Sequence, residues 1–148
     1  MDCGRKGRVS GASHLAVFLT GEQGAEREAE EAYRRGDERG DGAAASNLGT
    51  LLYERGDLEG AEAAWRRGDE RGDGGAAHNL GLLLAKRRDH AGARAAFHRA
   101  IDSGHAKYAP AAALRLGFLL AKRRDLAGAR AAFGQFWALC SKAASSRK

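Results

Sequence analysis

Residues 80–97 read LGLLLAKRRDHAGARAAF, and this stretch returns at 116–133 as LGFLLAKRRDLAGARAAF, with two differences in eighteen positions. A second stretch, AEEAYRRGDERGDG at 29–42, returns as AEAAWRRGDERGDG at 61–74. The copies are therefore 36 residues apart in the first case and 32 in the second. Self-similarity at such a period is typical of an array of small units that bury their apolar faces against their neighbours. The sequence predicts a repeat protein of this kind.

Each unit has the pattern of two amphipathic helices joined by a tight turn. Apolar residues follow i, i+3, i+4 spacing within each half, whereas the period-2 alternation of strands is absent. Between the halves, Gly56 suits a left-handed helix end and Asp57 suits the N-cap of the next helix. Asp89 and Asp125 occupy the same capping position, each preceded by Arg. We therefore predict an all-α chain of helix–turn–helix hairpins.

A Leu-Gly pair in each of the last three units is followed by an Ala twelve residues after the glycine and by an aromatic residue four positions later. These triplets are Gly49, Ala61 and Trp65; Gly81, Ala93 and Phe97; and Gly117, Ala129 and Phe133. We expect the alanine to face the glycine, because a missing Cβ lets two helices approach closely. The aromatic ring is then expected to fill the remaining gap.

With these residues the units resemble tetratricopeptide repeats of a short, bacterial type. Gly81, Ala93, Phe97 and Ala100 match all four positions of that family's pattern. The resemblance implies a right-handed α-solenoid of about four hairpins that binds protein partners, has no cofactor and is not an enzyme. It also implies a first, degenerate unit, which carries Gly24 but lacks the Leu-Gly pair.

The resemblance also divides the chain. We expect units at about 12–42, 43–74, 75–109 and 110–141, preceded by a flexible segment at 1–11 and followed by a disordered basic tail at 142–148.

Composition and motifs argue against several functions. The formal net charge is +6, from 25 Lys and Arg against 19 Asp and Glu. No catalytic motif, phosphate loop or metal-ligand spacing is found in the sequence, so neither catalysis nor a metal site is expected. Within the first twenty residues the only apolar run is LAVFL, which is too short for a secretory signal, and no run of 18 or more apolar residues that could span a membrane occurs in the sequence. The expected location is the cytoplasm.

The resemblance implies a concave groove lined by the first helix of each hairpin. The corresponding residues are Asn47 and Thr50 in the second unit, His78, Asn79, Leu82 and Lys86 in the third, and Leu114, Arg115, Phe118 and Lys122 in the fourth. In this family the inner-helix Asn often holds the backbone of a bound peptide, and an amide offers both a donor and an acceptor. The alternative is that Asn47 and Asn79 are solvated residues that reflect duplication. Arg115 occupies the equivalent position in the last unit and suits a carboxylate.

Two other functions stay open at this point. The AKRRD segments at 85–89 and 121–125 form a basic rim that could bind nucleic acid or another polyanion, although no aromatic residues alternate with them for base stacking. Phe136, Trp137 and Leu139 place apolar side chains where most equivalent residues of the earlier units are polar or small. Either these residues fold inward and cap the array, or they contact a second chain in a homodimer.

Overall fold

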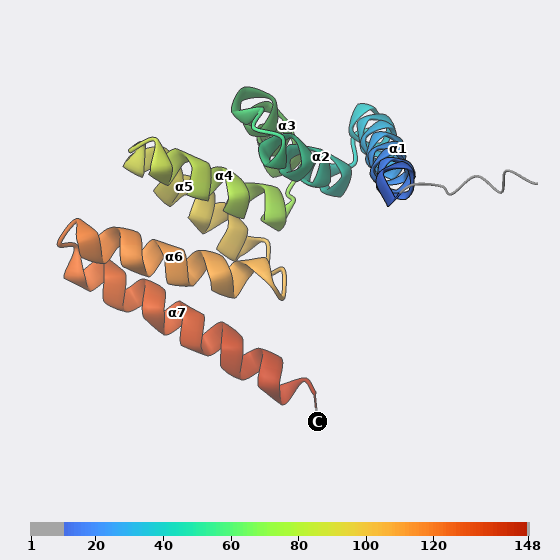
Figure 1. Ribbon diagram of the computed structural model, residues 1–148. Coiled ribbons are helices and arrows are strands. Elements are labelled where there is room, and N and C mark those ends of the chain that lie inside the picture. Colours follow the sequence, from blue (N-terminus) through green and yellow to red (C-terminus); the bar gives the residue numbers. More distant parts are fainter. Residues whose placement is uncertain (1–10, 148) are drawn as a thin grey trace, which may run out of the picture.

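The computed structural model describes the backbone of residues 11–147 and the side chains of residues 21–147. Within these residues it contains seven helices and no strand (Figure 1). Helix α1 spans Gly11–Glu38, and three hairpins follow: α2 (Gly42–Glu54) with α3 (Leu58–Glu70), α4 (Gly74–Lys86) with α5 (His90–Asp102), and α6 (Tyr108–Lys122) with α7 (Leu126–Ser145). The predicted all-α repeat solenoid is confirmed.

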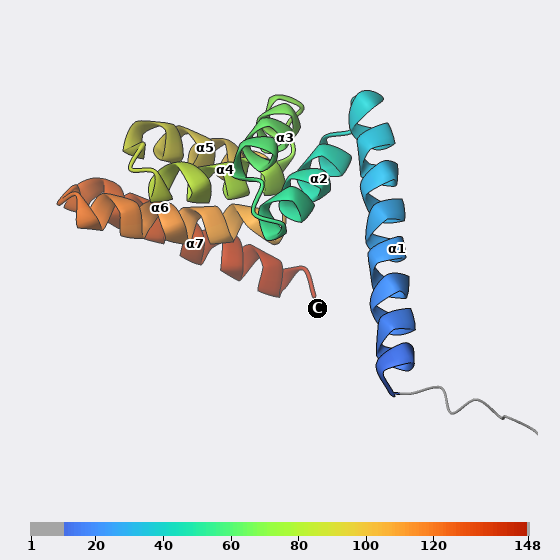
Figure 2. The ribbon, with the colours of Figure 1, turned by 45° about the horizontal axis from the view of Figure 1, so that its top comes forward.

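The hairpins stack in chain order, with α1 at one end of the array and α7 at the other (Figures 1 and 2). The first helices of successive hairpins contact one another, α2 with α4 and α4 with α6. The second helices α3 and α5 pack against the first helix of the next hairpin, α4 and α6 respectively. Helices α2, α4 and α6 therefore form a continuous inner layer.

Glycine and aspartate form the hairpin turns as predicted. Gly56 has a φ of +84°, and a carboxylate oxygen of Asp57 accepts a hydrogen bond from the Gly60 amide at 2.9 Å. The carboxylates of Asp89 and Asp125 form the same cap on α5 and α7. In these two turns the left-handed position is held by an arginine, Arg88 at φ +63° and Arg124 at φ +61°, which costs about 1–2 kcal/mol per residue relative to glycine.

An aromatic ring lies directly over the glycine inside each hairpin. A Cβ built on Gly81 would lie 2.7 Å from two ring atoms of Phe97, and Gly117 stands in the same relation to Phe133. Phe97 is fully buried, and Trp65, which covers Gly49, is almost so. The spacing predicts that the alanine faces the glycine and that the ring fills the remaining gap. The ring atoms are in fact the nearest neighbours of a Cβ built on each glycine, because a flat side chain fits the space that a missing Cβ leaves.

We expect Gly81→Ala to lower the free energy of unfolding by about 1–3 kcal/mol, because the added methyl overpacks the contact with Phe97. The matched control is Gly134→Ala in α7, where no atom lies within 4 Å of the added Cβ. Here we expect a gain of up to about 1 kcal/mol from helix propensity. Urea unfolding monitored by circular dichroism measures the stability of both variants. Equal stability of the two would contradict the close packing of Phe97 on Gly81.

The first predicted hairpin, 12–42, is wrong, because residues 12–38 of this segment belong to one continuous helix, α1. The sequence explains the difference when it is compared with the unit 32 residues later. Ala25 stands where Asp57 caps α3, so no carboxylate is available to start a new helix after Gly24. The array thus consists of three hairpins and a single long helix.

The ends of the chain also differ from the expected division. Helix α7 continues to Ser145, so residues 142–145 of the predicted disordered tail are helical. Lysine and two alanines in this segment favour continuation of the helix. Of the predicted flexible segment 1–11, residues 1–10 lie outside the described residues and Gly11 begins α1.

Buried carboxylates and arginines join neighbouring units. Asp37 of α1 is 6% exposed and accepts hydrogen bonds from Arg67 at 2.5 Å and from Arg71 at 2.6 Å. One unit later, Asp69 accepts from Arg99 at 2.6 Å in the same way. The hydrogen bonds from Arg67 outweigh the effect of burial and hold the pKa of Asp37 below its ordinary value.

We expect Asp37→Asn to lower the free energy of unfolding at pH 7 by about 1–2 kcal/mol, because the two arginines lose their counter-charge. The folded-state pKa of Asp37 is depressed, so its stabilisation is complete above an unfolded-state pKa of about 3.9 and is lost as the pH falls below it. Urea unfolding at pH 7 and pH 3 should therefore show a difference that shrinks in acid.

Glu38→Gln is the control for this experiment, since the neighbouring Glu38 is exposed and has no ion-pair partner among the described side chains. A loss of stability in the control as large as in Asp37→Asn would show that the buried pair contributes nothing specific.

Candidate partner-binding groove

A cavity of about 670 Å³ opens on the inner layer of the array. The first helices supply most of its lining: Thr50 and Tyr53 from α2; Asn79, Leu82, Leu83, Ala85 and Lys86 from α4; and Arg115, Phe118, Leu119 and Lys122 from α6. Trp65, His90 and Phe97 complete the lining from the second helices. We call this cavity the groove. Seven residues singled out in the sequence meet in it: Thr50, Asn79, Leu82, Lys86, Arg115, Phe118 and Lys122.

Three further residues singled out in the sequence lie outside the groove lining. Asn47 is exposed on α2, and Leu114 is half-buried on α6. The half-buried His78 ring lies near the rings of Phe97 and Tyr108, with centroids 6.2 and 5.7 Å away. Burial lowers the pKa of His78, so this ring stays neutral between its aromatic neighbours near neutral pH.

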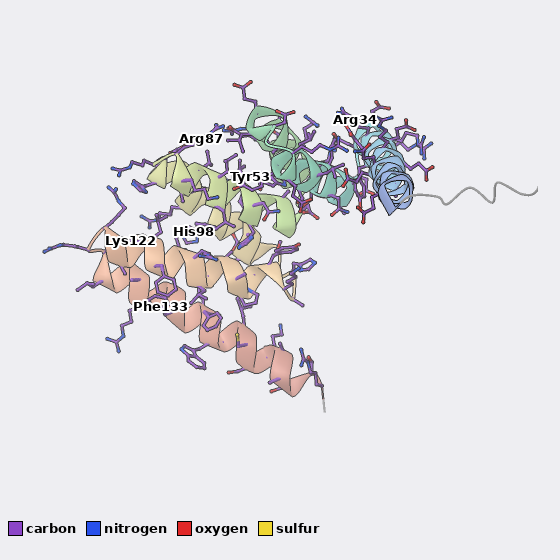
Figure 3. The ribbon with its side chains drawn as sticks, viewed as in Figure 1. Arg34, Tyr53, Arg87, His98, Lys122 and Phe133 are labelled. Atoms are coloured by element: carbon purple, nitrogen blue, oxygen red, sulfur yellow. The ribbon has the colours of Figure 1, made fainter. Side chains whose placement is uncertain are left out.

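The apolar part of the groove is formed by leucines and one exposed ring. Leu82 and Leu119 are half-buried, and both pack against the main core. Phe118 is 53% exposed, and its ring meets the Phe133 ring edge-on with centroids 5.4 Å apart. Phe133, labelled in Figure 3, thereby supports the exposed Phe118 ring at the edge of the groove.

The polar part of the groove is cationic. Lys86, Arg115 and Lys122 line it, and no carboxylate does. The Lys86 ammonium donates a hydrogen bond to the Tyr53 hydroxyl at 2.5 Å and lies 5.2 Å from the Tyr53 ring centroid. Tyr53 and Lys122 are both labelled in Figure 3 and come from the two outer first helices, α2 and α6. An anionic group in the groove would therefore meet positive charge without a competing acid.

The family model of the tetratricopeptide repeat matches residues 42–68 and 75–106. The segment from 42 to 106 therefore carries two tetratricopeptide repeats. The two matched segments coincide with the hairpins α2–α3 and α4–α5, and the α6–α7 hairpin carries the same glycine–ring joint. Tetratricopeptide repeats generally mediate protein–protein interaction. No protein with a curated description matches the sequence.

Seven residues of the groove lining were not among the groove positions predicted from the sequence: Tyr53, Leu83, Ala85 and Leu119 on the first helices, and Trp65, His90 and Phe97 on the second helices. Tyr53 follows Thr50 by three positions on the same helix face, so helical spacing was a sufficient signal. His90 begins the second helix of its hairpin, and only the packing of α5 against α6 brings it to the groove.

Exposed aromatic surface remains on the last helix of the array. Trp137 is 69% exposed, and its ring centroid lies 5.8 Å from that of the half-buried Phe136. Leu139 is also half-buried. The Trp137 ring therefore does not fold inward to cap the array. Helix α7 packs mainly against α6 and leaves this ring exposed.

Neither a metal site nor a membrane span emerges from the described part of the chain. Among residues 21–147, no cluster of three or more His, Cys, Asp or Glu side chains is placed to hold a metal ion. Among the helices between residues 11 and 147, none combines the length and apolarity needed to cross a bilayer.

Proposed function

We propose that this protein binds a peptide or helical segment of a protein partner in the groove, and that this segment carries both acidic and apolar residues. The observation that supports the proposal is the combination of three cations, no carboxylate and an apolar surface in one cavity of about 670 Å³. Such a lining complements a ligand that alternates carboxylates with leucine-like side chains.

Each part of the groove has a distinct task in this proposal. Asn79 offers its amide to the ligand backbone, and Arg115 pairs with a carboxylate. The Asn79 amide oxygen lies 3.4 Å from Nδ1 of His78, which helps to orient it. Leu82 and Phe118 bury apolar side chains of the ligand. Asn47 and Leu114 are proposed as outer contacts for a longer segment.

The probe is an acidic–apolar peptide of repeated Glu-Leu-Glu sequence. We expect the double variant Asn79→Ala/Arg115→Ala to bind it at least about tenfold more weakly than the parent chain does, because the variant loses one neutral and one charged hydrogen bond. Fluorescence anisotropy with a labelled peptide measures the affinity. A Lys-for-Glu peptide should not bind either chain.

Arg130→Ala is the matched control for this pair. It removes one exposed arginine from α7, outside the groove lining, and therefore should leave the affinity unchanged. Equal affinity of the double variant and the parent would rule out the groove assignment. If the affinities differ as expected, a pull-down from the native cell extract with the parent, the double variant and Arg130→Ala identifies a natural partner that binds in the groove.

Polyanion binding through the AKRRD rim is the second candidate. Arg87 is held by Glu62, whereas Arg88, Arg123 and Arg124 are exposed and have no ion-pair partner among the described side chains. Nucleic-acid binding through such a rim would weaken by about 10³-fold or more between 50 and 200 mM salt if six or more phosphates were contacted. Peptide binding in the groove should show a much smaller salt dependence.

Self-association through α7 is the third candidate, and the exposure of Trp137 favours it. If Phe136, Trp137 and Leu139 form a homodimer contact, the weight-average mass from sedimentation should rise with concentration. Trp137→Ala should return the protein to a monomer without loss of helix content, since this ring adds little to the core. A parent chain that stays monomeric at millimolar concentration would exclude this candidate.

A further inference from the structure

The repeats allow each junction between units to be compared with the next one. At the junction of α1 with the first hairpin, Glu30 accepts hydrogen bonds from Arg34 and from Arg55. One unit later, Glu62 of α3 accepts from Arg66 at 2.7 Å and from Arg87 at the end of α4. Both glutamates therefore sit between two arginines, and this contact lowers the pKa of each.

At the last junction the carboxylate is missing, and a histidine replaces one of its two arginine partners. Arg94 is the residue 32 positions after Glu62, His98 stands in the place of Arg66, and Arg123 stands in the place of Arg87. None of these three side chains has an ion-pair partner among the described residues. An arginine thus stands where the equivalent junction has its central carboxylate, next to a second arginine and a histidine.

These three residues line one cavity of about 590 Å³ between α5 and the turn from α6 to α7. His90, Ala91, Ala95, Leu119, Leu120 and Asp125 complete its lining. The only carboxylate among them, Asp125, already accepts the Gly128 amide at 2.9 Å as the N-cap of α7. His98, labelled in Figure 3, projects from the side of α5 that faces α6.

A buried polar atom in the same lining also lacks a partner. Nδ1 of His90 is shielded from solvent and makes no hydrogen bond within the described residues. His90 replaces Leu58 and Leu126, which occupy the equivalent position in the other two hairpins. An isolated buried nitrogen of this kind is costly unless a ligand or water satisfies it.

We propose that this cavity binds one oxyanion, a carboxylate or a phosphate group, in the place that the Glu62 carboxylate occupies one junction earlier. Arginine presents paired N–H donors that match both groups, so Arg94 and Arg123 can hold the anion from two sides while His98 donates from the third. The site is outside the groove and shares only His90 and Leu119 with it, and none of its three proposed anion donors lines the groove, so it does not depend on the function proposed above.

Thermal unfolding with inorganic phosphate tests the site. At constant ionic strength, replacing chloride by phosphate at about tenfold its Kd should raise the Tm of the parent chain by about 3–6 °C. Arg94→Glu places a carboxylate between His98 and Arg123. This variant should raise the Tm in chloride and no longer respond to phosphate.

Two further variants separate a specific site from general charge effects. Arg94→Gln should reduce the phosphate response without raising the Tm in chloride. Arg130→Gln should keep the full response, because Arg130 has the repeat position of Arg94 but lies outside the cavity lining. A phosphate response of equal size in all these variants would overturn the proposal, as would the absence of any response in the parent chain.

The source of the anion is resolved with the acidic probe peptide. If Arg94→Gln weakens peptide binding by about tenfold, as expected for a lost charged hydrogen bond, the partner supplies the anion. If only the phosphate response is reduced, a free anion fills the site. Either result supports an anion site. Asn79→Ala/Arg115→Ala should leave the phosphate response intact, so failure of the groove proposal is distinguishable from failure of this one.

Discussion

The contact between an aromatic ring and a glycine is the constraint on which every hairpin depends. Gly49, Gly81 and Gly117 leave a space on the first helix that only a flat ring from the second helix fills, and a Cβ at any of them would overlap that ring. The small alanines beside the ring, which are almost fully buried, then bring the two helices close together. These three glycine–ring contacts give successive hairpins the same spacing between their two helices, and the inner layer with its groove depends on that regular spacing.

Much of this geometry follows from spacing that can be read in the sequence. The Leu-Gly pair, the alanine and the aromatic residue predict hairpins, and Asp57 marks a helix start by a local rule. The continuous α1 was also readable, because Ala25 replaces the capping aspartate, but the other similarities to a repeat unit concealed it. Contacts such as Asp37 with Arg67 span 30 residues and depend on how one hairpin packs on the next, so no local pattern predicts them.

The hairpins share most of their sequence, so the positions at which they differ indicate where one hairpin has a property that the others lack. At equivalent positions of the first helices, Thr50 of α2 becomes Leu82 in α4 and Phe118 in α6, and Glu54, which lies outside the groove lining, becomes Lys86 and Lys122. The surface thus turns more apolar and more positive toward α6. Seven of the groove-lining residues were predicted from the family resemblance. The meaning of the change from Glu62 to Arg94 could not be predicted, because the partners of Glu62 become evident only in three dimensions.

Arginine–carboxylate contacts are distributed unevenly along the array, and this determines the order in which its helices detach during unfolding. Helix α1 packs mainly on α2 and is tied to its neighbours by Glu30 and Asp37, whereas α5 joins α6 through apolar packing. Acid and concentrated electrolyte weaken ionic contacts and leave apolar ones in place. Under such conditions α1 would detach first, and the α4–α7 block would be the last part of the chain to exchange its amide hydrogens with solvent.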